Sequence, residues 1–387
     1  MRALQFKRKP AKYAAAAVAG RLSAGKGASV GPLSLVDVDE LDLPADDWVR
    51  LRPRLAGICG SDLATIDGRS SRYFEPIVSF PFTPGHEVVG DLDDGSRAVL
   101  IPVLSCATRG IDPPCAACAA GEPNRCGRIA YGHLEPGLQT GFCTETGGGW
   151  STELVAHPSQ LLAVPDHLSD EAAVMVEPTA CAAHAAARVA EAGPFRHVAV
   201  IGAGTLGLLT IAALRAAGGA EIETLVATAK YPHQRAVASA FGADRVASPR
   251  ELGPVVRSLT GAFVLDGGQL TDGVDLVVDC VGSEASLAQA LQVVAPGGEV
   301  LVVGMPGHTS LDLTTLWHRE TAIRGCYAYT RADFDRALAL AAEADLGRLV
   351  SATYPLSRST EAIEHAANAG ARGAVKIAFD LRKKDRR

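Results

Sequence analysis

The chain has 387 residues, of which 48% are hydrophobic and 21% charged, a balance typical of folded globular proteins and not of disordered ones. Its 37 basic and 43 acidic residues give a net charge of -6 at pH 7, which argues against a surface for nucleic acid or for an anionic membrane. The length predicts two domains, and no stretch approaches the roughly 20 continuous apolar residues of a membrane-spanning helix. Chemistry on small molecules is therefore the expected class of function.

The first 36 residues contain seven Lys or Arg and no Asp or Glu, which superficially resembles a targeting segment. The apolar run 14–19 is too short for a secretory signal, so we expect the opening strands and turns of the fold here. Nine cysteines are present, and the spacing of Cys115, Cys118 and Cys126 suits metal thiolates better than secreted disulfides. We therefore expect a reducing, cytoplasmic location.

The part of the chain from about residue 30 to 160 is predicted to be mostly β. Short apolar runs are broken there by Gly, Pro and Asp, and Asp93-Asp94-Gly95 is the expected hairpin turn between strands at 88–90 and 98–100.

After Pro165 the pattern changes to Ala-rich helices that alternate with apolar strands, which predicts a parallel sheet. The expected strands are 198–201, 225–228, 275–280 and 300–303. Helices from residue 332 and through His365 and a strand at 375–379 follow, and residues 380–387 are expected to form a solvated charged tail.

A dinucleotide-binding motif lies at 197–207, where G-x-G-x-x-G directly follows an apolar strand and precedes a helix expected over 208–217. Gly202 permits a tight turn, Gly204 lets backbone N–H groups approach a pyrophosphate, and Gly207 lets helix and strand pack closely. The intervening Thr205 and Leu206 complete the predicted cofactor-binding loop.

The second strand of this region lacks the terminal Asp or Glu that would bind the ribose 2′-hydroxyl of NAD. The sequence instead offers one hydroxyl and three possible cations: Thr228, Lys230, His233 and Arg235. These groups suit a 2′-phosphate, so NADP(H) is preferred over NAD(H). The same residues are also compatible with the exposed face of the following helix.

Three short segments contain potential ligands of a catalytic metal: Gly57-Ile-Cys59-Gly-Ser-Asp, Pro84-Gly-His86-Glu and Val176-Glu177-Pro. Together they offer a thiolate, an imidazole and a carboxylate, from which a catalytic zinc takes three protein ligands and keeps a fourth position open. Individually they are also compatible with a buried thiol, a core histidine and a helix N-terminal acid.

With these motifs the chain resembles the zinc-dependent medium-chain alcohol dehydrogenase family over most of its length, including the closing segment 373–379. The resemblance implies an α/β protein. It consists of a GroES-like, β-rich catalytic domain (1–177 and 326–387) and an inserted Rossmann domain with a doubly wound parallel sheet (178–325). The active site is expected in the cleft between these two domains.

The resemblance also implies roles for individual residues. Cys59, His86 and Glu177 would bind the catalytic zinc. Glu87 would lie beside it as an occasional exchange ligand, and Asp62 would orient His86.

Ser61 would correspond to the hydroxyl that passes on the substrate proton. The relay histidine that many family members have five residues after the cysteine is replaced by Ala64, so the proton route stays open. Gly304 and Met305, just past a sheet strand, are placed near the nicotinamide, although Gly304 is equally compatible with a plain turn.

A second group of four cysteines suits a closed, tetrahedral structural zinc: Cys106, Cys115, Cys118 and Cys126. In the family pattern the first ligand stands three residues before the second, where this chain has Asp112. We favour Cys106 over Asp112, because segment 97–106 looks like the run that leads into the first ligand, with residues 107–114 inserted.

The expected function is therefore zinc-dependent hydride transfer between NADP(H) and an alcohol or carbonyl substrate, by a homodimer or homotetramer. One alternative is an NADPH-dependent reductase of an activated C=C or C=N bond, for which the missing relay histidine matters less. A second is a non-catalytic NADPH-binding protein of the same fold. The sequence leaves the substrate and the physiological direction open.

Overall fold

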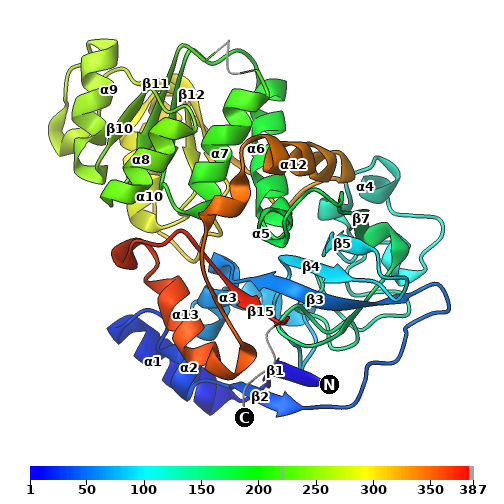
Figure 1. The fold of residues 1–387 in the computed structure, drawn as a ribbon. Helices are drawn as coiled ribbons and strands as arrows, with labels where there is room; N and C mark the ends of the chain where they lie inside the picture. The colour runs from blue at the N-terminus through cyan, green and yellow to red at the C-terminus, as the bar shows by residue number, and fades with distance from the viewer. Residues whose placement is uncertain (219–221, 383–387) are drawn as a thin grey trace. The chain divides into compact units, whose positions relative to one another are not determined.

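The computed structural model describes residues 1–218 and 222–382 (Figure 1). The chain forms two compact units, Met1–Glu177 with Tyr329–Arg387, and Pro178–Ala328. The chain thus returns to the first unit at Tyr329, three residues later than residue 326, where the C-terminal part of the catalytic domain was predicted to begin. Among the described residues, no helix is long and apolar enough to cross a membrane.

The first unit is built on a mixed seven-stranded sheet in the order β14-β15-β3-β4-β5-β7, with β6 also paired to β3. Its strands are β3 (Val49–Gly57), β4 (Val88–Asp91), β5 (Arg97–Leu100), β6 (Leu154–Ala156), β7 (Leu161–Ala163), β14 (Val350–Tyr354) and β15 (Lys376–Asp380). β14 and β15 are parallel, and the other pairs are antiparallel. The turn between β4 and β5 includes Gly95, whose φ of 81° is a left-handed conformation that glycine adopts readily.

Aromatic side chains fill the core of this unit. Trp150 is fully buried, packs edge-on against Phe379 at 5.1 Å between ring centroids, and donates from Nε1 to the carbonyl of Gly57 at 3.1 Å. This hydrogen bond fixes the end of β3, two residues before Cys59.

Helices lie around the sheet of the first unit: α1 (Pro10–Leu22), α2 (Gly27–Val30), α3 (Gly60–Ile66), α4 (Ala116–Ala119), α5 (Asp170–Ala173), α12 (Arg331–Glu343) and α13 (Ser359–Ala367). Helix α6 (Val176–Ala192) begins in this unit and continues into the second.

The prediction of only strands and turns for the first 36 residues is wrong. Strands β1 (Arg2–Phe6) and β2 (Leu33–Asp37) do form a two-stranded sheet, but the 13-residue helix α1 lies between them in sequence. Its alanines have the highest helix propensity, and Pro10 suits a first helical position. The buried carboxylate of Asp67 then accepts N–H groups from Gly25 and Gly27 at 2.9 and 3.0 Å, which holds the following turn.

The prediction of a solvated tail is also wrong for its first residue, Asp380. Asp380 is a buried residue of β15, and the Arg382 guanidinium donates to Asp380 at 3.0 Å and to Asp170 at 2.7 Å. These charge-assisted bonds anchor the segment. Residues 383–387 of the expected tail lie outside the described residues.

The second unit is a six-stranded parallel sheet in the order β10-β9-β8-β11-β12-β13, the strand order of a doubly wound dinucleotide-binding fold. Its strands are β8 (His197–Ile201), β9 (Thr224–Thr228), β10 (Arg245–Ala247), β11 (Val274–Asp279), β12 (Val294–Val302) and β13 (Ala322–Gly325). Its helices, besides α6, are α7 (Thr205–Ala216), α8 (Pro232–Ala240), α9 (Leu252–Thr260), α10 (Glu284–Val293) and α11 (Leu313–His318). The predicted fold class is confirmed.

Candidate active site and metal centres

The junction between β3 and α3 positions the candidate thiolate. Cys59 is the N-cap of α3, and its backbone N–H donates to Asp62 Oδ2 at 3.0 Å, which closes the first turn. The other carboxylate oxygen of Asp62 lies 3.6 Å from His86 Nδ1. One buried carboxylate therefore fixes the backbone at Cys59 and faces the imidazole of His86.

His86 is buried two residues before β4. The preceding Gly85 has φ 97°, and a Cβ there would lie 2.4 Å from Trp150, so this approach requires glycine. His86 Nδ1 and Asp62 Oδ1 have no hydrogen-bond partner but face each other, which directs Nδ1 to the carboxylate and leaves Nε2 for another ligand. Burial opposes protonation of His86, but Asp62 and Cys59 outweigh it, and the pKa of His86 lies well above its usual value.

Glu87 points to a buried lysine that the sequence analysis did not identify. Lys376 Nζ forms an ion pair with Glu87 Oε2 and also donates to the carbonyl of Ile58 at 3.2 Å. Burial opposes the charge of Lys376, but Glu87 raises its pKa above the usual value. The signal available in the sequence was the position of Lys376 inside the closing segment 373–379, which the family resemblance covers.

Glu177 lies in the first turn of α6 and is buried. Tyr329 Oη donates to Glu177 Oε1 at 2.9 Å, a contact between residues 152 positions apart. Burial raises the pKa of Glu177 to about 7. A cation bound beside such a carboxylate favours its ionised form. No sequence pattern pointed to Tyr329.

Ser61 lies in the first turn of α3, half-buried, on the same helix as the buried Ala64. The hydroxyl of Thr65 donates to the backbone carbonyl of Ser61 at 3.0 Å and lies 2.9 Å from the hydroxyl of Ser70. Helix α3 thus carries the hydroxyl groups of Ser61 and Thr65, and has Ala64 at the position of the family histidine.

The residues present fit a catalytic zinc by the chemistry of their donors. Cys59, His86 and Glu177 supply a thiolate, an imidazole and a carboxylate from separate elements, and His86 has a carboxylate behind it as metal-bound histidines do. The ligand atoms of these three residues are more widely spaced than those of the four-cysteine group. Among the described residues, only the four-cysteine group has all its ligand atoms within 4.8 Å of one another.

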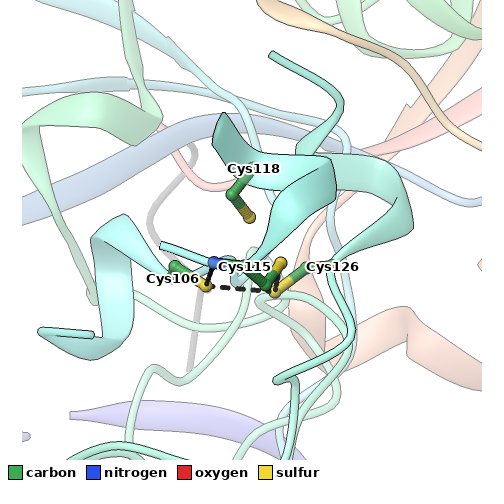
Figure 2. A group of neighbouring side chains, drawn as sticks. All are labelled: Cys106, Cys115, Cys118 and Cys126. Carbon is green, nitrogen blue, oxygen red and sulfur yellow. Dashed lines mark hydrogen bonds between the residues drawn. The ribbon is translucent and has the colours of Figure 1, made fainter. Parts of the chain in front are cut away.

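The second group is compact (Figure 2). The sulfur atoms of its four cysteines, Cys106, Cys115, Cys118 and Cys126, all lie within 4.8 Å of one another. The Cys106–Cys126 and Cys115–Cys126 Sγ distances are 3.7 and 3.9 Å. A tetrahedral zinc with bonds of about 2.3 Å separates its sulfur ligands by about 3.8 Å. The geometry therefore fits a structural zinc, and the group includes Cys106 and not Asp112.

Backbone N–H groups point to these sulfurs, as in thiolate metal sites. Cys115 N–H donates to Cys106 Sγ at 3.3 Å, and Arg128 N–H donates to Cys126 Sγ at 3.4 Å. Hydrogen bonds from the backbone of Cys118 and Gly127 lower the pKa of Cys115 to about 6. At least one thiol of the group is thus readily ionised at neutral pH.

The surrounding lobe depends on a buried arginine that sequence reasoning missed. Arg109 is fully buried, and its guanidinium donates to the carbonyls of Tyr131, Leu134 and Gly137 at 3.0, 3.0 and 2.7 Å. It holds segment 131–137 against the cysteine lobe.

The glycine loop of the second unit fits a dinucleotide. Gly202 has φ 95°, and its N–H donates to Thr228 Oγ1 at 2.9 Å. A Cβ at Gly207 would lie 1.8 Å from the Gly202 carbonyl, whereas a Cβ at Gly204 would meet nothing within 4 Å. Gly204 is the N-cap of α7, so its open side lies at a helix N-terminus, where a pyrophosphate is favoured; Thr205 and Leu206 begin that helix.

The residues after β9 lie close together. Thr228 is buried and its hydroxyl bonds to the loop backbone. Lys230 is exposed, with Nζ 5.5 Å from the centroid of the Tyr231 ring, and that ring stacks on His233 at 6.0 Å. Arg235 donates to the carbonyl of Ala229 at 3.2 Å.

Gly304 and Met305 follow β12. A Cβ at Gly304 would lie 2.6 Å from backbone atoms of Val281, so close packing of the chain requires this glycine. Met305 is partly exposed.

Comparison with known proteins identifies the family of the chain. Residues 45–166 match the alcohol dehydrogenase GroES-like domain model, and residues 205–343 match the zinc-binding dehydrogenase model. L-idonate 5-dehydrogenase of Vitis vinifera is 29% identical over 347 residues, which cover 86% of this chain and 88% of that protein. A protein of Rhizobium meliloti named "Putative D-xylulose reductase" is 30% identical over 348 residues, covering 88% and 93%.

Among solved structures, alcohol dehydrogenase TADH from Thermus sp. ATN1 superposes with a TM-score of 0.71 at 25% identity, covering 98% of this chain and 99% of that one. The fold and the two domain matches thus define a zinc-binding, nicotinamide-dependent oxidoreductase. The chain belongs to the zinc-dependent medium-chain alcohol dehydrogenase family. The predicted class, a zinc-dependent alcohol oxidoreductase, is confirmed.

Proposed function

We propose that this enzyme interconverts a polyhydroxylated alcohol and the corresponding carbonyl compound, with NADP(H) as hydride carrier. The observation that carries the proposal is the buried arrangement of Cys59, His86 and Glu177 with Asp62 behind the imidazole. The named relatives act, by their names, on idonate and xylulose, which supports a substrate rich in hydroxyl groups.

In this proposal Cys59, His86 and Glu177 would hold the catalytic zinc, which would supply Lewis-acid polarisation of a substrate oxygen. Asp62 holds the imidazole of His86 in the tautomer that presents Nε2. Lys376 keeps the carboxylate of Glu87 engaged in a buried ion pair beside these ligands.

The proton of the substrate hydroxyl passes to Ser61 in this proposal, because its hydroxyl is on the first turn of the helix that begins at Cys59. Ala64 cannot carry a proton, so the exit leads from Ser61 to water or to a ribose hydroxyl.

Cys106, Cys115, Cys118 and Cys126 bind a second, structural zinc in this proposal, with Cys106 and not Asp112 as the fourth ligand. The near-tetrahedral sulfur spacing of 3.7 and 3.9 Å supports this assignment. A zinc site made of four thiolates also favours a reducing compartment such as the cytoplasm, since an oxidising one would promote disulfides between these cysteines.

NADP(H) is preferred because Lys230, His233 and Arg235 are grouped after β9, where NAD-binding folds have an acidic residue. Gly202, Gly204 and the start of α7 hold the pyrophosphate.

A homodimer or homotetramer is supported by β13, an edge strand of the six-stranded sheet whose four residues are all exposed. Trp317 on the preceding helix is 78% exposed. An unpaired edge with nearby apolar surface favours pairing with a second copy.

The test follows nicotinamide absorbance with NADP and NAD separately, across polyols, simple alcohols, aldehydes and activated alkenes. Cys59→Ala should abolish turnover and leave NADPH binding largely intact, with about two zinc ions per chain in the unmodified enzyme. Cys143→Ala, which also removes a buried thiol of this unit, is the matched control. Normal turnover by Cys59→Ala would exclude a zinc-centred mechanism, and reduction of alkenes without alcohol turnover would favour a C=C reductase.

A further inference from the structure

Glu177 is held by Tyr329, a residue that has no role in the proposed zinc-dependent reaction. Tyr329 Oη donates to Glu177 Oε1 at 2.9 Å, and the two residues are 1% and 4% exposed. Fixing a glutamate side chain costs rotamer entropy. A hydrogen bond to Oε1 selects one orientation beforehand and leaves Oε2 available as a ligand.

Tyr329 is itself fixed from two sides. Its ring packs edge-on against the buried Phe334, with centroids 4.6 Å apart and an interplanar angle of 82°. The next residue, Thr330, is the N-cap of α12, and its N–H and hydroxyl both donate to Asp333 Oδ2 at 2.8 Å. The position of the phenol is therefore set by a capped helix rather than by a flexible loop.

The chain passes between its two units immediately after Glu177 and immediately before Tyr329. The hydrogen bond between them thus joins segments that are 152 residues apart in sequence. Helix α6 fixes the backbone of Glu177, and the hydrogen bond from Tyr329 constrains its carboxylate.

We propose that Tyr329 is a positioning residue for the reaction, whose hydroxyl sets the Glu177 carboxylate so that Oε2 binds the catalytic zinc. The inference rests on the proposed function, because it takes Glu177 as the third zinc ligand. Removal of a group that orients a metal ligand typically costs about 10- to 100-fold in metal affinity or activity.

Tyr329→Phe tests this, because it keeps the ring and its contact with Phe334 and removes only the hydroxyl. Tyr354→Phe is the matched control: Tyr354 is a buried tyrosine of the same unit, and its Oη lies 2.8 Å from His365 Nδ1. Both full-length variants are assayed for zinc affinity by chelator competition, for the visible spectrum of the cobalt-loaded enzyme, for kcat and KM, and for thermal unfolding.

Tyr329→Phe should bind the catalytic zinc about tenfold more weakly, shift the cobalt bands and lower kcat about tenfold, with the KM for nicotinamide unchanged. Tyr354→Phe should change only the unfolding temperature. Equal zinc affinity and equal spectra in the two variants would overturn the inference.

Glu177→Ala separates this inference from the proposed function. If that variant keeps zinc with unchanged affinity, the proposed ligand set is wrong and the inference fails with it. If it loses zinc while Tyr329→Phe matches the control, only the inference fails. In the Glu177→Ala background, Tyr329→Phe should cause no further loss of affinity, and a full further loss there would contradict it.

Discussion

Gly204→Ala should separate cofactor binding from folding. Gly204 has φ -77° and ψ -168°, a conformation that alanine adopts without strain, and a Cβ there would meet no atom within 4 Å. The folded chain is therefore not strained. The restricted unfolded chain adds about 0.4–1 kcal/mol of stability, which offsets the weaker preference of alanine for the N-cap position. The methyl group would nevertheless occupy the space through which a pyrophosphate approaches the loop. Loss of one hydrogen bond to a charged phosphate costs about 1.5–3 kcal/mol, or roughly 10- to 100-fold in Kd.

The assay is NADPH fluorescence titration together with thermal unfolding of the full chain. Gly253→Ala, in helix α9, is the matched control, because its Cβ also meets nothing within 4 Å and it lies outside the glycine loop. Gly207→Ala should instead lower the unfolding temperature, because its Cβ would lie 1.8 Å from the Gly202 carbonyl oxygen. Wild-type NADPH affinity in Gly204→Ala would refute the placement of the pyrophosphate at this loop.

Three further outcomes are expected. Lys230→Ala should raise the Kd for NADPH about tenfold and leave the Kd for NADH unchanged in the same titration. Cys118→Ser should reduce the zinc content by one ion per chain and lower the unfolding temperature, measured by metal analysis and calorimetry. Burial opposes ionisation of Asp170, but hydrogen bonds from Arg54 and Arg97 outweigh this effect and lower the pKa of Asp170. Its contribution to the stability of the fold is therefore complete above the unfolded-state pKa of about 4. That contribution is lost as pH falls through the lower, folded-state pKa. Urea unfolding at pH 7 and pH 3 should show a smaller stability difference in Asp170→Asn than in the wild type.

The sequence was most informative where chemistry is local. Strand β8, the glycine loop and α7 are consecutive, so one stretch of chain contains the whole pattern and its structural context. Three of the four cysteines were similarly accessible, because they fall within one short segment. The fourth member of the group was not, since the inserted residues left Cys106 and Asp112 as alternatives, and only the folded lobe shows which side chain lies beside the other sulfurs.

Sequence reasoning missed the residues whose importance depends on distant partners. Lys376 becomes a buried cation only because β15 pairs with β3 and brings it to Glu87. Tyr329 meets Glu177 across 152 positions. Helix α1 was missed for another reason: its basic, acid-free composition drew attention to targeting, whereas Pro10 and the alanine run already indicated a helix.

The charges of the candidate active site explain why these missed residues matter. Asp62, Glu87 and Glu177 are three buried carboxylates, and Lys376 forms an ion pair with Glu87. Burial raises the pKa of Asp62 and of Glu177, because removal from water disfavours the ionised form of each carboxyl group. A divalent cation bound beside these carboxylates would favour their ionised forms. In the proposed site the lysine and the tyrosine have complementary effects: Lys376 forms an ion pair with Glu87, and the hydroxyl of Tyr329 orients the Glu177 carboxylate.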